Sequence, residues 1–569
     1  MVIKKHIPKI GLLLILLFSG VVCTTTLWSY GSNVQSTQNN IVSSNSIPIQ
    51  SNPSPSNTDQ SGNQGINQDQ SISQSQNISQ NSSQPPQPLN GQFQPSATRQ
   101  SIAPNHGSKP NGRANGSEGT NASAGASYTL EIIAYAVAFL MFFLAAYYLI
   151  TKKKLKILPG NAKILILSLL GVGLLLRIPM ALVISSHPFD LSTFKNWATT
   201  AANNFSQFYQ GRNASDYPPL YIYLLFIIGK LGSLTALSPY FTLLLKLPSI
   251  VADIATSFLI YKLAKKYLSL EISILLAAFY TFNPAVLINS TIWGQVDSFF
   301  TLIIVGAIVL LTEKKIGLAS VLFTAAVLMK PQGIIFLPVL FFELIRQKAL
   351  KSWINVVLSA LVTAIVIVLP FSLNTNGLWI FKLFASTLGE YPYASVNAFN
   401  FFSLLGANFT KDEGILFVLS YHSWGMMSIV LITAFSWFLF IKGKSRVYAS
   451  AVALLLIDGV FTFSSRMHER YLFPAVALSI LTFIYLKDKR LLLLATGYSA
   501  SIYINTHFVL YETLIGINSI AYGPILIVTS FLNVLLFVYL IKVLYDVVRE
   551  RRRSNGVIPS EEPIVSNLT

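Results

Sequence analysis

The chain has 569 residues, of which 52% are hydrophobic and only 11% are charged. Because soluble globular domains carry about 25% charged residues, this composition excludes an ordinary soluble fold. The formal net charge of +18 at pH 7 does not indicate a nucleic-acid partner, since the basic clusters lie in separate short segments beside apolar runs. With one cysteine, Cys23, the chain can form no intrachain disulfide and offers no cysteine-based metal cluster.

The N-terminal 127 residues fall into two parts. Residues 1–23 join a basic start to an apolar run from Ile10 to Val22, which predicts a signal sequence or signal anchor. Lipidation of Cys23 is left open, although Val22 stands where a small residue is usual. Residues 24–127 are dominated by Ser, Asn, Gln, Pro and Gly, which cannot bury enough apolar area to offset ordering entropy. They predict a disordered extracytoplasmic tether, which acts as a passive spacer rather than a binding segment.

Residues 128–548 predict an all-α, polytopic transmembrane helical bundle with about 13 spans in addition to the N-terminal run, since many apolar runs approach or exceed roughly 20 residues. Basic clusters such as Lys152 to Lys156 follow the positive-inside pattern of cytoplasmic loops. The resulting orientation places the basic tail, 549–569, in the cytoplasm and predicts a multi-pass protein of the plasma membrane. The segment from Pro218 to Leu234 predicts an interfacial helix within the first large outer loop.

That loop carries two polar motifs. HPFDLSTFKNWA places Asp190 just past the end of a predicted span. In a transferase, such an acid would take the proton of an acceptor hydroxyl, whereas the alternative is a solvated loop acid. In DYPPLY, two prolines start the interfacial helix after Tyr217. Tyr217 is either an interfacial anchor or part of a rigid wall of an outer cavity.

Two further motifs are expected on the same outer face. NPAVLINSTIWGQVD contains Trp293, Gln295 and Asp297. This set suits a sugar, whose apolar face packs on the ring while its hydroxyls bond the amide and acid; an interfacial turn with an anchoring Trp is the alternative. MKPQ places Lys330 and Gln332 between two short helices. A cation there indicates a phosphate partner, or else a snorkelling lysine.

The motif SSRMHERYLFP concentrates charge at the outer end of two predicted spans, with Arg466, His468, Glu469 and Arg470. Ionisable groups at a membrane edge are unfavourable unless paired or functional. Two arginines suit bidentate phosphate binding, and a structural Arg–Glu pair is the alternative. Asn397 lies in a second long outer loop, and long ordered loops are often functional.

Five of these segments, in this order, resemble the GT-C superfamily of membrane glycosyltransferases: HPFDLSTFKNWA, DYPPLYIYLL, FNPAVLINSTIWGQVDSFF, MKPQGIIFLP and RMHERYLFPA. More narrowly, they resemble prokaryotic mannosyltransferase-like proteins related to the enzymes that mannosylate GPI anchors and dolichol-linked glycans. The likeness covers roughly residues 160–490. It implies a GT-C-like fold, a sugar donor linked to a polyprenyl phosphate, and inverting transfer on the extracytoplasmic face. In this resemblance Asp190 matches the family's loop acid, which implies the general base. Tyr217 matches the family's YPP element, and Gln295 and Asp297 match its polar loop. The positions that line the donor and acceptor cleft are matched by Lys330, Gln332, Arg466, His468, Glu469 and Arg470.

The chain departs from the family pattern in having no DxD pair. A divalent metal is therefore left open, and no other cofactor is indicated. The expected partners are a polyprenyl-phosphate-linked sugar, membrane lipid and a glycan, lipid or protein acceptor. The motifs GxxxxGK[ST], HExxH and GxSxG do not occur, which removes support for ATP-driven transport and ordinary hydrolases.

Two other functions stay open at this point. A transporter or flippase of lipid-linked glycans predicts ionisable groups near mid-membrane and two pseudo-symmetric halves. Arg177, Asp253 and Asp458 could be such groups, but the sequence contains no evident internal repeat. A non-catalytic scaffold would use the tether to recruit partners and would tolerate changes of the outer charges.

Overall fold

The computed structural model describes residues 2–44, 128–211, 215–373, 375, 377–513 and 519–555. This part of the chain is almost entirely helical, which confirms the all-α membrane class. The elements of its first half are α1 (Val2–Ser44), α3 (Thr129–Thr151), η1 (Pro159–Asn161), α4 (Ala162–Val183), α5 (Pro188–Asn203), η2 (Phe208–Gln210), α6 (Pro219–Gly232), η3 (Ser238–Tyr240), α7 (Phe241–Tyr267), α8 (Leu270–Thr281), α9 (Pro284–Leu287), η4 (Ile288–Trp293) and α10 (Asp297–Thr312).

The second half contains the only sheet in the described part of the chain, a two-stranded antiparallel pair in which Ile415 faces Ser420. Its elements are α11 (Ile316–Val327), η5 (Pro331–Phe336), α12 (Leu337–Gln347), α13 (Leu350–Ser372), α14 (Trp379–Gly389), α15 (Phe401–Leu404), β1 (Ile415–Leu416), β2 (Leu419–Ser420), α16 (Tyr421–Gly443), η6 (Arg446–Tyr448), α17 (Ala449–Phe463), α18 (Pro474–Leu486), α19 (Arg490–Glu512) and α20 (Pro524–Asn555).

The N-terminal segment forms a helix, α1, that continues past the predicted start of the tether at residue 24 and ends at Ser44. The rest of the predicted tether, residues 45–127, lies outside the described residues. The chain divides into two compact units, one comprising residues 1–39 and 119–569 and the other residues 40–118. All elements from α3 onward belong to the first unit.

Within the described residues, nine helices are long and apolar enough to cross a membrane, and one of them is in the N-terminal run. The other eight compare with the roughly 13 spans predicted beyond that run. The difference lies partly in apolar helices that are short. α10 has 16 residues, α11 has 12 and α18 has 13. At 1.5 Å per residue, even α10 is about 24 Å long, which is less than the roughly 30 Å hydrocarbon core of a bilayer.

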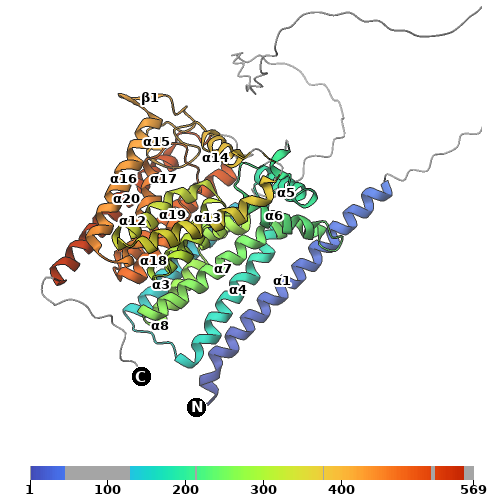
Figure 1. Cartoon of the computed structure of the whole chain (residues 1–569). Helices are drawn as coiled ribbons and strands as arrows, with labels where there is room; N and C mark the ends of the chain where they lie inside the picture. Colours follow the sequence, from blue (N-terminus) through green and yellow to red (C-terminus); the bar gives the residue numbers. More distant parts are fainter. Residues whose placement is uncertain are drawn as a thin grey trace, which may run out of the picture. The chain divides into compact units, whose positions relative to one another are not determined.

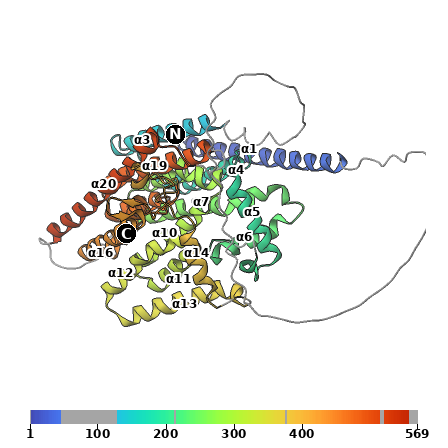
Figure 2. The ribbon, with the colours of Figure 1, turned by 90° about the horizontal axis from the view of Figure 1, so that it is seen from above.

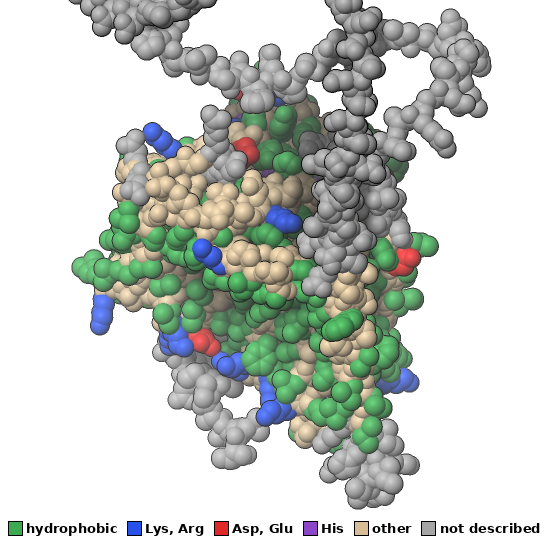
Figure 3. All heavy atoms as spheres, turned by 90° about the vertical axis from the view of Figure 1, so that its right-hand side faces the viewer, with side chains coloured by type: hydrophobic (Ala, Val, Ile, Leu, Met, Phe, Trp, Pro, Cys, Tyr) green, Lys and Arg blue, Asp and Glu red, His purple; other side chains and the backbone are tan. Residues whose placement is uncertain are grey.

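The core of the first unit is centred on α17 and α18, whose side chains are buried along nearly their whole length. α3 and α13 differ, because most of their apolar side chains are exposed. An apolar helix surface without protein cover is typical of a face that contacts lipid. Figure 3 shows a broad apolar surface of this kind, with Lys and Arg side chains gathered along its lower edge.

Several short elements lie at one end of the long helices. Figure 1 shows α5, α6 and α14 at this end, and the connection from α3 to α4 at the other. Figure 2 also shows α5 beside α6, and the two helices pack together. The shared core contains Phe194, Trp197 and Tyr221. The predicted interfacial helix corresponds to α6, and its packing fixes the start of α5, where Asp190 lies.

Candidate active site

Asp190 lies in the first turn of α5, directly after a capped helix start. His187 is the capping residue, and its Nδ1 accepts a hydrogen bond from the Asp190 backbone N–H at 3.2 Å. Pro188 suits the first helical position because it has no N–H that needs a partner. The positive end of the helix dipole favours a carboxylate here. These features hold Asp190 in one place, with 19% of its side chain exposed.

The π-helical turn η4 lies opposite Asp190 and ends at Trp293. The Asn289 carbonyl accepts hydrogen bonds from the backbone N–H groups of both Gly294 (3.1 Å) and Gln295 (3.0 Å). Gly294 has φ +89°, in the left-handed region that favours glycine. π-Helical turns are frequent at functional sites. This turn places the side chains on either side of Gly294 against Asp190.

Both of those side chains bind the same carboxylate oxygen. Trp293 Nε1 donates to Asp190 Oδ2 at 2.7 Å, and Gln295 Nε2 donates to the same atom. Asp190 Oδ1 has no hydrogen-bond partner among the described residues, and His187 Nδ1 lies 3.8 Å from it. A carboxylate with one oxygen fixed and the other unbonded can accept a proton from a further group.

The Trp293 ring is only 2% exposed. It stacks on the His187 ring, with centroids 5.2 Å apart and planes 12° apart, and the Arg470 guanidinium lies 5.6 Å from its centroid. This ring was predicted either to pack on a sugar or to anchor an interfacial turn. In the structure it packs on two side chains of the site instead, and its N–H holds Asp190.

Beside Asp190 lies a buried ionic cluster formed by Asp297, Lys330, Glu469 and Arg470. Lys330 forms an ion pair with Asp297, and their side chains are 3% and 2% exposed. Arg470 forms an ion pair with Glu469, and its Nε lies 3.8 Å from Asp297 Oδ2. Taking charges out of water is unfavourable unless they are paired. Each carboxylate of the cluster contacts a cation, so that condition is met. The contacts connect four side chains from three segments that are distant in sequence.

Arg470 is the member of this cluster with donors to spare. Its side chain is 14% exposed, whereas its Nε is buried on the side of Asp297 and has no hydrogen-bond partner within the described residues. It also interacts electrostatically with Asp190 as well as with Asp297 and Glu469. A guanidinium has five N–H donors in a planar fork, which suits an oxyanion better than a buried ammonium does. An anion could therefore bind Arg470 without displacing every existing contact.

Two tyrosines flank Lys330. Its ammonium lies 5.6 Å from the ring centroid of Tyr217 and 5.7 Å from that of Tyr471. Cation–π contacts of this kind stabilise a desolvated ammonium. Pro218 caps α6 and Pro219 is its first residue, so the rigid start of this helix fixes the position of Tyr217. Tyr217 therefore contacts the ionic cluster through Lys330, and its role as a wall of an outer cavity stays a prediction.

A pair of acids lies near the cluster. Asp216 and Glu390 form a side-chain hydrogen bond, and the Asp216 carbonyl accepts a bond from Thr387 Oγ1 at 2.8 Å. Burial raises the pKa of Asp216, while burial and the adjacent Asp216 raise the pKa of Glu390 to about 7. Two carboxyl groups in contact avoid repulsion by sharing a proton. The pair joins the loop before α6 to the end of α14.

His468 is buried between aromatic rings next to the ionic cluster. The Tyr391 ring meets it edge-on at 4.7 Å, and the Tyr471 ring lies 5.0 Å away. Burial lowers the pKa of His468 well below its ordinary value, and the charges of Arg470 and Lys330 add to this effect. The imidazole is therefore neutral near pH 7, which suits a hydrogen-bonding role rather than a charged contact with phosphate.

Arg466 does not join this cluster, although it stands in the same sequence motif as Arg470. It has φ +63°, its Nε donates to Asp412 at 2.7 Å and its Nη1 donates to the Leu388 carbonyl at 2.8 Å. Its backbone N–H bonds the Tyr393 carbonyl at 2.9 Å. Arg466 thus attaches the loop between α14 and α16 to the segment before α18, which favours the structural alternative over phosphate binding.

Asn397 has a similar role in that loop. Its φ is +54°, and its side-chain oxygen accepts from Asn408 Nδ2 at 3.0 Å and from the Ile520 N–H at 3.0 Å. Its carbonyl accepts from Asn505 Nδ2 at 2.8 Å. These contacts hold the loop against the helices. Gln332 is different, because its Nε2 is buried without a hydrogen-bond partner in the described part of the chain.

Behind the site, α7 supports the turn that holds Asp190. Ser249 Oγ donates to the Gln295 carbonyl at 2.7 Å. The buried Lys246 Nζ donates to the Ala181 carbonyl at 2.8 Å, in the last turn of α4. A Cβ added at Gly294 would lie 3.2 Å from Lys246 Cγ, so the turn packs directly on this lysine. Lys246 therefore links the end of α4 to the Trp–Gly–Gln turn.

Sequence reasoning singled out Asp190 and most of the cluster, but missed several residues that complete the site: His187, Lys246, Ser249, Asn289, Asp216, Glu390 and Tyr471. Four of these, His187, Asp216, Asn289 and Tyr471, stand inside the quoted motifs, so their position was a usable signal. Glu390 lies in the second long loop, seven residues before Asn397. Lys246 and Ser249 stand outside those motifs, within an apolar run.

Among the described residues, no group of three or more His, Cys, Asp or Glu side chains is placed so that it could hold a metal ion. A scan against protein-family models found no match for this chain, and a search of curated proteins found none either.

Proposed function

We propose that this chain is a membrane glycosyltransferase that moves a sugar, mannose or another hexose, from a polyprenyl phosphate to an acceptor hydroxyl. The reaction takes place at the extracytoplasmic face, which is the face that the basic loops predict for Asp190. One observation carries the proposal: Trp293 and Gln295 fix one oxygen of Asp190, while its other oxygen has no hydrogen-bond partner within the described residues.

In the proposed reaction, Oδ1 of Asp190 accepts the proton of the acceptor hydroxyl. The acceptor oxygen attacks the anomeric carbon from the side opposite the phosphate and forms the new glycosidic bond. The bond between the anomeric carbon and the phosphate oxygen breaks, and its electron pair leaves with the phosphate. The configuration at the anomeric carbon is inverted. Two donors on Oδ2 keep the carboxylate in line, which supplies part of the rate.

Arg470 is the residue that we assign to the leaving phosphate. It is partly exposed, its Nε lacks a hydrogen-bond partner in the described part of the chain, and it interacts electrostatically with Asp190. Fixed donors that face a developing negative charge lower the barrier. Lys330 is more deeply buried and acts through Asp297, which it holds against Arg470. Gln332 Nε2 is a further unpaired donor beside Lys330.

The test is release of polyprenyl phosphate by the purified full-length chain in lipid nanodiscs. Polyprenyl-phosphate mannose is supplied first, then other hexoses, with membrane extract as the source of acceptor. Asp190→Asn keeps the acceptor atom for Trp293 and Gln295 but is a much weaker base. We expect it to lower turnover by at least about 100-fold.

Asp546→Asn is the matched control, because this carboxylate pairs with Arg490 far from the site. It should release polyprenyl phosphate like the wild type. Equal release by Asp190→Asn would show a transferase whose base is another residue. No release from any donor, with an acceptor extract shown to be active, would reject the transferase.

A flippase of lipid-linked glycans is the second candidate, and Asp458 is the observation that favours it. This carboxyl is fully buried in α17, where it accepts hydrogen bonds from Tyr498 and Thr462 and has no basic partner among the described residues. Lone acids in spanning helices are typical of transport proteins. Movement of a fluorescent lipid-linked glycan across the bilayer without release of polyprenyl phosphate would support this function.

A further inference from the structure

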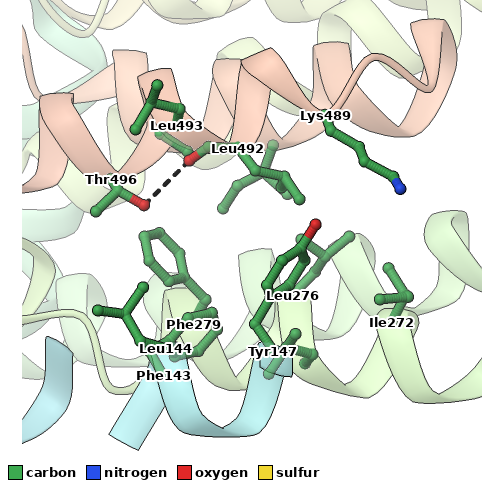
Figure 4. Close-up of a pocket in the computed structure, with 13 residues that line it drawn as sticks. Phe143, Leu144, Tyr147, Ile272, Leu276, Phe279, Lys489, Leu492, Leu493 and Thr496 are labelled. Atoms are coloured by element: carbon green, nitrogen blue, oxygen red, sulfur yellow. Dashed lines mark hydrogen bonds between the residues drawn. The ribbon is translucent and has the colours of Figure 1, made fainter. Parts of the chain in front are cut away.

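A pocket of about 250 Å³ lies between α3, α8 and α19, with α18 behind it. Its walls are mainly apolar and include Phe143, Leu276 and Leu492 (Figure 4). Leu144 and Leu493 line it as well and are 60% and 62% exposed. The pocket therefore opens on a surface where apolar side chains are uncovered, as on a face that contacts lipid.

The polar groups of this pocket are unevenly placed. Figure 4 shows Lys489 and the Tyr147 hydroxyl away from Thr496, which lies toward the other end. Thr496 donates its hydroxyl to the Leu492 carbonyl at 3.0 Å and has no donor left for a ligand. The side-chain polar atoms of Lys489 and Tyr147 have no hydrogen bond or ion pair within the described residues. A ligand would thus find a cation and a hydroxyl at one end only.

The same end of the bundle is strongly basic. α3 ends at Thr151 and is followed directly by Lys152, Lys153 and Lys154, whose side chains are exposed. From Lys489 to Thr496 the pocket follows about 10 Å of α19, at 1.5 Å per residue. The fitting ligand is a molecule with a flexible apolar chain and an anionic group at one end. Free phosphate fits poorly, because the walls offer it no donors beyond that one end.

We propose that this pocket binds one anionic phospholipid of the surrounding membrane. A segment of its acyl chain occupies the space between Phe143, Leu276 and Leu492, and its phosphate contacts Lys489 and the Tyr147 hydroxyl. Anionic headgroups are attracted to juxtamembrane lysines, whereas the apolar chain supplies the burial. This site lies at the opposite end of the helices from Asp190 and does not depend on the proposed enzymatic activity.

A second hollow, between α12 and α16, has no charged lining residue and can be compared with the pocket beside Lys489. It is lined by Phe341, Val430, Trp437 and other apolar residues, with Thr433 as its one hydroxyl among the described residues. No Lys or Arg of the described chain lines it. Such a surface can accept any acyl chain and cannot select a headgroup. Selection between phospholipids is therefore expected only at the pocket beside Lys489.

The experiment titrates the detergent-solubilised full-length chain with phosphatidylglycerol or phosphatidylcholine of identical acyl chains and counts retained lipid by native mass spectrometry. We expect one retained phosphatidylglycerol that phosphatidylcholine does not replace. Lys489→Gln should weaken its binding by about fivefold, the effect of one basic residue at a membrane surface. Leu493→Trp should lower occupancy further, because the larger side chain covers the opening.

Two control variants distinguish a specific lipid site from nonspecific attraction of the lipid to exposed lysines or exposed apolar surface. Lys487→Gln removes a neighbouring exposed lysine that does not line the pocket, and Leu361→Trp changes an exposed leucine of α13. Both should bind phosphatidylglycerol like the wild type. The proposal is overturned if the wild type retains no lipid or holds both lipids equally. It is also overturned if Lys487→Gln weakens binding as much as Lys489→Gln does, or if Leu361→Trp matches Leu493→Trp.

Discussion

Two buried clusters in this protein both contain an aspartate and an arginine, yet they differ in what surrounds them. In the first, Arg177 of α4 lies 3.5 Å from Asp253 of α7, and the two side chains are 1% and 0% exposed. In the second, Asp297 contacts Lys330 and Arg470. The first lies between the long helices α4 and α7, whereas the second adjoins the start of α6 through Tyr217 and is partly exposed through Arg470.

The arginines of the two clusters also make different contacts. Arg177 donates to the carbonyls of Gly173 and Thr281, so it joins α4 to the end of α8. Arg470 instead lies over Trp293, whose N–H binds Asp190. Burial of charge is thus not enough to indicate a functional site. The connection of a buried cluster to an accessible acid is the feature that distinguishes the second cluster from the first.

Replacing a charge pair in each cluster is the sharpest way to test this difference. Arg470→Gln combined with Glu469→Gln removes one positive and one negative charge and leaves Asp297 paired with Lys330. We expect release of polyprenyl phosphate to fall by about 10²–10³-fold, the usual effect of losing a donor that faces a developing charge. Thermal unfolding should change little, because no buried charge is left without a partner.

The corresponding change in the enclosed cluster is Arg177→Met combined with Asp253→Leu. Apolar replacement of a complete buried pair is often neutral or stabilising. Release should therefore stay within about fivefold of the wild-type rate, with an unchanged or higher unfolding temperature. If this variant loses activity as strongly as the Arg470 and Glu469 variant, the enclosed pair is part of the reaction and the comparison fails.

Removing only one partner of the enclosed pair should affect stability rather than chemistry. Asp253→Ala leaves Arg177 buried without its carboxylate, at a cost of about 3 kcal/mol. Denaturant-induced unfolding followed by circular dichroism in micelles would measure this loss. Asp546→Ala, which removes a partly exposed acid, is the control and should cost less than about 1 kcal/mol. Equal losses would mean that the Arg177 pair is solvated.

The acid pair beside the site predicts that the stability of the folded chain depends on pH. The pKa values of Asp216 and Glu390 are raised in the folded chain, that of Glu390 to about 7. The native state therefore holds more protons than the unfolded state above pH 4, and stability falls as pH rises toward 7. The Glu390 carboxyl is covered on the side of Asp216, but the residue as a whole is open to solvent, which screens the effect. We therefore expect a loss of only about 1 kcal/mol between pH 5 and pH 8.

Thermal unfolding at pH 5, 6, 7 and 8 would measure this effect. Glu390→Gln should remove most of the slope, since a neutral amide can still bond Asp216. Glu413→Gln, an exposed acid of the same outer loop, should keep the wild-type slope. A slope that persists in Glu390→Gln would assign the titration to another group.

Much of the fold could be predicted because apolar runs and basic loops follow simple physical rules. The positive-inside pattern placed Asp190, Asp297 and Lys330 at one membrane face, and the structure brings these side chains together. The number of spans was less predictable. Short helices such as α11 and α18 are as apolar as full spans, and only packing determines where they end.

The site was less predictable where a side chain's partner is distant in sequence. Asp412, which binds Arg466, lies 54 residues away from it. The π-helical turn before Gly294 has no composition that would indicate it. Lys246 stands inside an apolar helix, and the sequence around it does not indicate which group its ammonium contacts. Hydrophobic periodicity describes the faces of helices and does not specify such contacts.

Replacing Arg466 gives the smallest expected effect. It tests whether Arg466 and Arg470, which stand in one motif, have different roles: attachment of a loop and binding of phosphate. Arg466→Gln breaks the contact with Asp412, which still has His422 Nδ1 at 3.3 Å. Because Arg466 is 30% exposed, we expect release to change by less than about fivefold. Limited proteolysis of the second outer loop should become faster, since its anchor to the Leu388 carbonyl is lost. Arg470→Gln, measured alongside, should lower release far more. Equal losses in the two variants would place both arginines at the phosphate and would assign the contact with Asp412 to a state of the protein without bound substrate.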